Sequence, residues 1–473
     1  METPVQTYKV AVLELISIAL LGAGLWECGL GWAQLFGITP SHHSLYPATG
    51  TFYNPGPYCG FLAMLVPLAL RHVLKPEYRF TNWLATAYII LAVAIMPVLM
   101  GRTGWIAAAV GCLLVAVGCG RIKRPRPVVL IAVFAVAAIA GALLFYLKPA
   151  SALGRLFLWR MGLDAAFQHP LTGVGWNQVA GALGAAQETY FNSSPESMFA
   201  NVAGTPEYAF NEFLQIGIAF GIPAMLLFII LLVLAARMAW RGGAYGVAGS
   251  IAAFSVVCFS SYPLQFPEFM VAVGIMIAGA FFASPCRCVL VKWTLYLLLA
   301  CGITFACRWL MHRNELAGEW ERMRYVCRYR LDDRSIHLLD SLDAIHGHSP
   351  KYLFDYGKAL RETGLYDKSN GVLMRGVELS ADPMFLNLIG RNYYDLGQYG
   401  KAEHYFLRAA DRLPGRMYPY YLLARMYADP AVNDSVRFSV VHEKVVRMSP
   451  KIMSPAIRQM RSELDSLRTT FTR

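Results

Sequence analysis

Residues 154–179 read GRLFLWRMGLDAAFQHPLTGVGWNQV, and residues 204–221 read GTPEYAFNEFLQIGIAFG. With the residues between them, they form the longest polar interruption in an otherwise hydrophobic stretch of 311 residues. Apolar segments of membrane-spanning character lie on both sides of this interruption. A polar loop held by a membrane domain is a favourable place for chemistry at a membrane surface.

The composition predicts a membrane domain followed by a soluble tail. The chain has 473 residues, of which 56% are hydrophobic and 15% are charged, which is too apolar for an average soluble protein. The first 311 residues carry few charges, whereas the remainder is rich in Arg, Asp, Glu and Tyr. This uneven distribution indicates two parts with different surroundings.

The apolar runs predict an all-α fold, a polytopic membrane domain of about nine transmembrane helices. A helical tail is expected to follow it. The nine runs are 10–25, 61–70, 85–100, 105–117, 128–147, 216–235, 247–262, 269–283 and 293–310.

The basic loops predict the orientation of these helices. With nine spans, the loops 71–79, 121–126, 237–241 and 287–292 all fall on one side, which the positive-inside rule assigns to the cytoplasm. The N-terminus is then cytoplasmic, and the loop 148–208 and the tail lie outside. We expect the inner membrane of a bacterium, with the tail in the periplasm. Because much of the net charge of +12 lies in these loops, it does not indicate nucleic-acid binding.

The tail contains an internal repeat. Residues 383–414 read PMFLNLIGRNYYDLGQYGKAEHYFLRAADRLP, which matches the tetratricopeptide pattern, and its marks recur about one repeat earlier and later. In such repeats small residues such as Gly390 and Ala402 let paired helices approach, and aromatic residues fill the gap. The repeats are a candidate surface for a protein partner, and the alternative is a packing spacer without a ligand.

These features predict four segments. Residues 1–311 form the membrane domain with its large external loop 148–208. Residues 312–349 form a linker helix region, 350–446 the repeats, and 447–473 the C-terminal tail.

Four motifs lie on the outer side in this topology: GTFYNPG at 50–56, GRTGW at 101–105, the segment from Arg155 to Gly175, and YAFNEFLQ at 208–215. An Arg beside a membrane helix either snorkels to the interface or binds a phosphate with its planar fork. The Gly-Val-Gly of the third motif is a turn and does not indicate a nucleotide site.

The fourth motif predicts a helix beginning at Thr205. Thr205 is a suitable N-cap, Pro206 suits the first helical position, and Glu207 suits the positive end of the helix dipole.

In this order, the four motifs resemble the O-antigen ligase and polymerase superfamily, whose members transfer glycans from undecaprenyl diphosphate. The resemblance extends over roughly residues 30–285. It implies glycosyl transfer at the outer leaflet without a metal or another cofactor, and it implies that Arg102 and Arg155 hold the diphosphate. We add Trp159, Arg160 and Asn211 to the expected substrate-binding set. The acceptor stays open between lipid A-core, a protein hydroxyl and a growing polysaccharide.

The sequence departs from the resembled family at the expected base. Members usually have a His directly before the Asn of the fourth motif, where this chain has Phe210. Glu207 is three residues earlier and would share the face of Phe210 on a helix, so we predict it as the catalytic base. His169 is the second candidate, and a mechanism without a strong base is the third. Glu212 would face away from position 210 on such a helix.

Two other functions remain as alternatives. A transporter for a lipid-linked glycan would require polar residues within the spans, and the apolar runs show almost none. A non-catalytic scaffold or inactive relative, which recruits partners through its tail, would explain the missing His. Both are distinguished from the ligase by an assay for glycan transfer.

Overall fold

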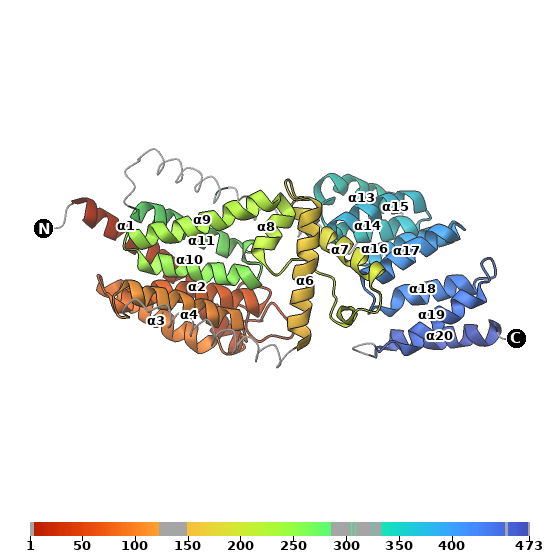
Figure 1. The fold of residues 1–473 in the computed structure, drawn as a ribbon, viewed down its shortest axis with the longest axis horizontal. Coiled ribbons are helices and arrows are strands. Elements are labelled where there is room, and N and C mark those ends of the chain that lie inside the picture. The colour runs from red at the N-terminus through yellow and green to blue at the C-terminus, as the bar shows by residue number, and fades with distance from the viewer. Residues whose placement is uncertain are drawn as a thin grey trace. The chain divides into compact units, whose positions relative to one another are not determined.

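The computed structural model describes residues 4–122, 149–284, 333–449 and 453–471, together with positions 304, 308 and 324. Within these residues the regular elements are all helices, as the predicted all-α class requires (Figure 1). Three of the helices are long and apolar enough to cross a membrane: Val10–Leu35, Pro55–Leu74 and Ile222–Arg241. The predicted spans at 128–147 and 293–310 lie outside the described residues.

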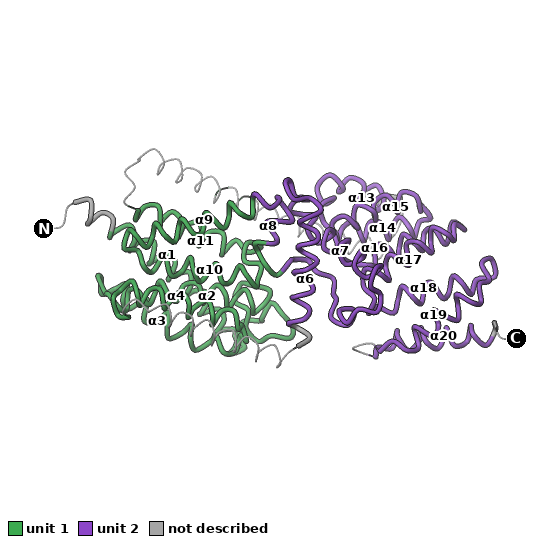
Figure 2. Tube along the Cα trace, viewed as in Figure 1, with its two compact units in different colours: residues 1–144, 210–213, 224–312 green, residues 145–209, 214–223, 313–473 purple. Residues whose placement is uncertain are grey.

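The described chain forms two units by its internal contacts (Figure 2). Unit 1 comprises residues 1–144, 210–213 and 224–312, and unit 2 comprises residues 145–209, 214–223 and 313–473. The helices of unit 1 are α1 (Pro4–Leu35), α2 (Pro55–Leu74), α3 (Arg79–Ile95), α4 (Arg102–Gly118), α9 (Ile222–Arg241), α10 (Tyr245–Ser260), η3 (Pro263–Gln265) and α11 (Pro267–Ala283).

Helix α2 lies at the centre of unit 1, where it packs against α1, α3, α4 and α10 (Figure 1). Most of its residues are buried. Small residues allow the close approach of its neighbours, because a Cβ at Gly111 of α4 would lie 2.4 Å from Cγ of Pro67 and 2.6 Å from the carbonyl oxygen of Gly249. Such small-residue contacts hold apolar helices together where lipid removes the hydrophobic drive for association.

The GTFYNPG motif begins α2. The Asn54 side chain accepts a hydrogen bond from the Gly56 amide at 2.9 Å, and Pro55 occupies the first helical position. The helix therefore starts at Pro55, six residues before the apolar run at 61–70.

Helix α1 is longer than its apolar run, because the structure provides partners for Glu27. The Glu27 carboxylate accepts hydrogen bonds from the amide of Thr51 at 3.1 Å and from the Thr51 hydroxyl at 2.8 Å. A polar residue paired in this way does not end an apolar helix. The helix consequently continues to Leu35.

The run at 216–235, predicted as one span, is two helices. Helix α8 (Glu212–Phe220) ends before Gly221, and α9 begins at Ile222. Gly221 has a φ of 89°, a left-handed conformation that interrupts a helix. An apolar run does not report such a break, because hydropathy carries no information on φ.

Unit 2 joins the central loop to the tail (Figure 2). The helices of unit 2 are α6 (Pro149–Gln168), η1 (Trp176–Gln178), α7 (Val179–Ser193), η2 (Met198–Asn201), most of α8, α13 (Asp333–His346), α14 (Pro350–Glu362), α15 (Tyr366–Leu379), α16 (Met384–Asp395), α17 (Tyr399–Arg412), α18 (Met417–Ala428), α19 (Ser435–Arg447) and α20 (Pro455–Phe471). Most of the expected loop 148–208 is helical, and within it α7 and η1 pack on helices of the tail.

In the tail, each helix from α13 to α20 packs against the next along the chain. The predicted approach of small residues is present, since a Cβ at Gly390 would lie 2.5 Å from the Phe406 ring. A Cβ at Gly376 would lie 2.0 Å from the ring of Phe385. Both rings are buried, so neither can move aside without opening the core.

We expect Gly376→Ala to destabilise the tail and Gly371→Ala to stabilise it. Both glycines lie in α15, but the space around Gly371 is open, so alanine there adds only helix propensity, about 1 kcal/mol. At Gly376 the added methyl group displaces Phe385, at a cost of about 1–3 kcal/mol. Amide hydrogen exchange of residues 366–395 in the full-length protein measures both effects, and faster exchange in Gly371→Ala would contradict the packing described.

Candidate functional site

In unit 1, the turn that carries Arg102 is pinned to α2 and α10. A Cβ at Gly101 or Gly104 would lie 2.5 or 2.6 Å from Cys59 of α2, so both positions require glycine. The Thr103 hydroxyl lies 2.7 Å from that of Ser260 at the end of α10. Arg102 is the first residue of α4 and is exposed. The packing therefore fixes the backbone at Arg102.

In unit 2, α6 carries three of the predicted binding residues. Arg155 and Trp159 are one turn apart, and both arginines of this helix are exposed. The Arg160 guanidinium lies over the Tyr190 ring of α7, 4.8 Å from its centroid. This cation–π contact gives Arg160 a role in holding α6 against α7.

Aromatic packing orients α6. Phe157 is 2% exposed, and its ring centroid lies 5.2–5.3 Å from those of Tyr190, Phe191 and Phe199. Aromatic pairs at these separations favour defined ring orientations. Phe157 therefore packs α6 against α7 and η2, and α7 is the neighbour that supports the helix carrying Arg155.

The segment Pro170 to Gly175 caps the end of α8. The amides of Val174 and Gly175 each donate a hydrogen bond of 2.9 Å, to the carbonyls of Ile218 and Ala219. The Ile222 amide in turn donates to the carbonyl of Pro170 at 2.7 Å. Helix ends leave such carbonyls without partners, and Pro223 has no amide to offer Ala219. This motif is thus a structural clasp around the break at Gly221.

The helix predicted to begin at Thr205 is absent, and α8 begins only at Glu212. The Ala209 amide donates to Oε1 of Gln215 at 2.9 Å, and Phe210 has a φ of 49°. A side-chain acceptor therefore replaces the helical partner of Ala209, and the left-handed residue prevents a continuous helix. The prediction was wrong because the local capping signals say nothing about the distant acceptor Gln215.

This correction removes the geometric argument for Glu207. Glu207 lies outside any helix and is exposed, so it does not share a helical face with Phe210. His169, the second candidate, is also exposed and lies directly after α6. Asn211 is 6% exposed and immediately precedes α8.

Glu212 is fully buried in unit 1. Its Oε2 accepts a hydrogen bond from the Leu264 amide at 3.2 Å, and among the described residues its Oε1 has no hydrogen-bond partner. Burial raises the pKa of the Glu212 carboxyl to about 8. Because the side chain is fully buried, an acceptor hydroxyl cannot reach it in this structure, and this burial, rather than the helical angle predicted from the sequence, argues against Glu212 as the base.

The sequence model of the O-antigen ligase family matches residues 87–229. The match covers less than half of the chain and contains Arg102, the arginines of α6, His169, Glu207 and Asn211. No curated protein matches the chain. The family match supports the O-antigen ligase superfamily, and together with the apolar helices it indicates a membrane protein with a function in glycan transfer.

Several polar residues of unit 2 were not singled out from the sequence. They include Gln215, which fixes the segment before α8, and Glu188 of α7, which pairs with Arg408 and Arg412 of α17. Their signal is tertiary, because the partners of Glu188 lie more than 200 positions away. Among the described residues, His, Cys, Asp and Glu side chains form no group of three suited to hold a metal.

We expect Gly221→Ala to lower the Tm more than Gly175→Ala. Both glycines have left-handed φ values, 89° and 97°, which alone cost alanine about 1–2 kcal/mol. The Cβ at Gly221 would also lie 2.4 Å from the carbonyl oxygen of Leu171, whereas the space around Gly175 is open. Thermal unfolding in detergent compares the two variants, and an equal loss would argue against the clasp.

Proposed function

We propose that this protein transfers a glycan from undecaprenyl diphosphate to an acceptor at the outer face of the bacterial inner membrane. The observation that carries the proposal is the family match over 87–229, which spans Arg102 and Arg155. Both residues are exposed and lie on α4 and α6, whose backbones are held by packing.

The chemistry of the donor explains the need for arginine. A sugar on a polyprenyl diphosphate is already activated, and the leaving diphosphate gains negative charge as the glycosidic bond breaks. Fixed cations stabilise this developing charge. Arginine is suited to it, because its guanidinium donates bidentate hydrogen bonds and stays protonated at physiological pH. Arg102 and Arg155 are assigned to the diphosphate, and Trp159, Arg160 and Asn211 to the surrounding donor site.

The acceptor hydroxyl must lose a proton during transfer. Glu207 is our first candidate for the base and His169 the second, and their exposure leaves both accessible to a substrate. The tail, as a tetratricopeptide-type solenoid, would hold the acceptor: a lipid A-core, a protein or a growing polysaccharide. The stacking of its consecutive helices supports this assignment.

A second candidate function, a non-catalytic relative, is favoured by one observation. Phe210 stands where the resembled family has its His, and its ring packs against that of Tyr262 at 5.0 Å between centroids. A phenyl ring cannot accept a proton. If the wild-type protein shows no glycan transfer and Phe210→His creates this activity, the chain is an inactive relative.

We expect Arg155→Lys to lower the rate of glycan transfer about 100-fold, although the charge is kept, because the bidentate fork is lost. The measurement is transfer of a lipid-linked glycan by purified protein. The matched control is Arg237→Lys in the last turns of α9, at the end predicted to face the cytoplasm, which should retain full activity. Near-full activity of Arg155→Ala would move the diphosphate site elsewhere.

For the base, we expect Glu207→Gln to abolish transfer while donor binding is retained, because the amide cannot accept the proton. The same transfer assay and equilibrium binding of the donor lipid separate the two effects. Wild-type turnover in Glu207→Gln, combined with loss of activity in His169→Ala, would transfer the role to His169.

We expect position 193 to face the periplasm and position 123 the cytoplasm, since the loop 121–126 is basic. In a background without exposed cysteines, a membrane-impermeant thiol reagent should label Ser193→Cys in intact cells. Lys123→Cys should react only after the cells are opened. Labelling of position 123 from outside would overturn the topology.

A further inference from the structure

Helix α7 approaches the tail along a stripe of small residues. A Cβ at Gly181 would lie 1.9 Å from the carbonyl oxygen of Glu378, and one at Gly184 would lie 2.7 Å from Cα of Ala381. Backbone therefore meets backbone at both positions, which any larger side chain would prevent. Glu188 continues the same face of α7 at helical spacing.

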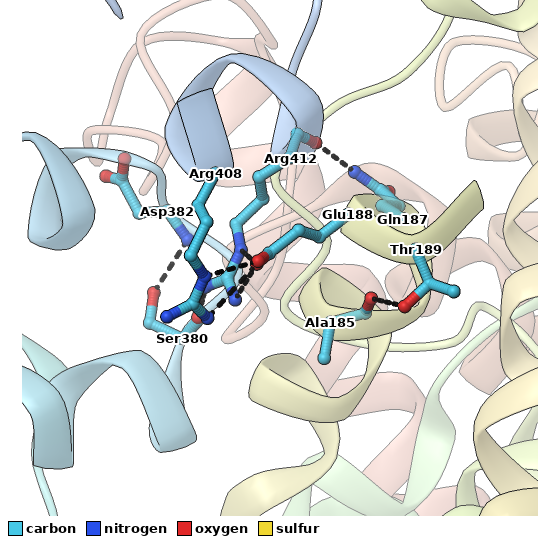
Figure 3. A network of polar contacts seen from close by, with 8 residues as sticks. All are labelled: Ala185, Gln187, Glu188, Thr189, Ser380, Asp382, Arg408 and Arg412. Carbon is cyan, nitrogen blue, oxygen red and sulfur yellow. Dashed lines mark hydrogen bonds and ion pairs between the residues drawn. The ribbon is translucent and has the colours of Figure 1, made fainter. Parts of the chain in front are cut away.

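Two arginines of α17 converge on the Glu188 carboxylate (Figure 3). Arg408 bonds Oε1, and Nη2 of Arg412 lies 2.9 Å from Oε2. The side chain of Arg412 is 1% exposed and that of Glu188 is 16% exposed. This is a largely buried, charge-assisted cluster between a segment of the central loop and the tail.

Further hydrogen bonds from Gln187 and Arg412 to backbone carbonyls support the cluster. The Gln187 side chain, 2% exposed, donates to the carbonyl of Arg412 at 3.0 Å and to that of Gly204 at 3.0 Å. Arg412 also donates to the carbonyl of Ser380 at 3.2 Å. The tail thereby holds α7, and Gln187 of α7 in turn holds the chain that leads toward α8.

Helix α7 also holds α6, through other side chains. Tyr190 and Phe191 contact Phe157, and Tyr190 lies beneath the guanidinium of Arg160. Phe157 and Arg160 flank Trp159 and follow Arg155 on α6. A continuous set of contacts thus runs within unit 2 from the arginines of α17, through α7, to the helix that carries Arg155.

The geometry points to Glu188 as a positioning residue: through it the tail sets the orientation of α6 and therefore of Arg155. This inference rests on the proposed function, since it gives the tail a task in the donor site besides any binding of the acceptor. Arg408 and Arg412 are one turn apart on α17, so a carboxylate shared by both fixes the rotation and the axial position of α7 together. An apolar contact is non-directional and would leave both free to adjust.

The competing explanation is that the cluster only stabilises the tail. The two explanations differ in what happens to Arg155. If Glu188 acts through Arg155, replacing Glu188 must lower the turnover less in a variant that already lacks the Arg155 guanidinium, because coupled residues give non-additive effects. If Glu188 only stabilises the fold, the fold-losses in turnover from replacing Glu188 and from replacing Arg155 multiply in the double variant.

The first measurement is amide hydrogen exchange on the full-length protein, which needs no turnover. Glu188→Gln should speed exchange in residues 149–168 and 179–193 and leave 417–447 unchanged. The matched control is Glu196→Gln, which removes the same charge from an exposed position and should change none of these segments. Unchanged exchange in 149–168 would overturn the proposal, even if the protein shows no transfer activity.

The second measurement is a double-mutant cycle in the glycan-transfer assay. Glu188→Gln alone should lower turnover at least about tenfold, because small misplacements of a positioning group are costly. In the Arg155→Lys background, the same substitution should cost less than about twofold. A tenfold loss in both backgrounds, or full turnover in Glu188→Gln despite faster exchange, would overturn the positioning role.

A further variant guards against unfolding of Glu188→Gln. Glu188→Asp keeps the charge and withdraws the carboxylate by one methylene, so it should give an intermediate loss with the same dependence on Arg155. If wild-type protein transfers no glycan, the proposed function fails, and hydrogen exchange of residues 149–168 alone decides whether Glu188 restrains α6.

Discussion

One carboxylate shared by two guanidinium groups ties the central loop to the tail within unit 2: Glu188 with Arg408 and Arg412. Removal of this carboxylate leaves the buried guanidinium of Arg412 without its anionic partner, at a cost of about 3–5 kcal/mol. Because the partners come from segments more than 200 residues apart, the contact makes the central loop and the tail one structural unit. The glycines Gly181 and Gly184 on the same face of α7 allow the close approach of the backbones beside this cluster.

The second constraint is the set of hydrogen bonds around Gly221, which join the segment Pro170 to Gly175 to the end of α8 and to Ile222. There the chain leaves α8 in a left-handed conformation, and the segment Pro170 to Gly175 supplies the hydrogen bonds that the helix end lacks. The glycines of this clasp adopt left-handed conformations, and its amides donate hydrogen bonds to helix carbonyls. These structural roles account for a glycine-rich motif here without a bound phosphate. Exposed arginines lie instead on α4 and α6.

The sequence predicted the helical class, the apolar segment 105–117 that α4 (Arg102–Gly118) contains, and the resemblance that the family match supports. Hydropathy and the order of motifs suffice for these, because both are local properties of the chain. The helix expected at Thr205 failed for the converse reason. Its capping residues suit a helix start, but the amide of Ala209 donates a hydrogen bond to the Gln215 side chain instead, and Phe210 has a left-handed conformation.

The sequence by itself therefore determined the all-helical class, the apolar segments of the membrane domain, and the residue types suited to binding a diphosphate. Only the tertiary structure decided where the span at 216–235 breaks, that Glu212 is buried, and that α7 of the central loop packs on the tail. The physical reason is that hydropathy and helix propensity are summed along the chain. Burial, left-handed turns and shared carboxylates depend instead on partners brought together from distant positions.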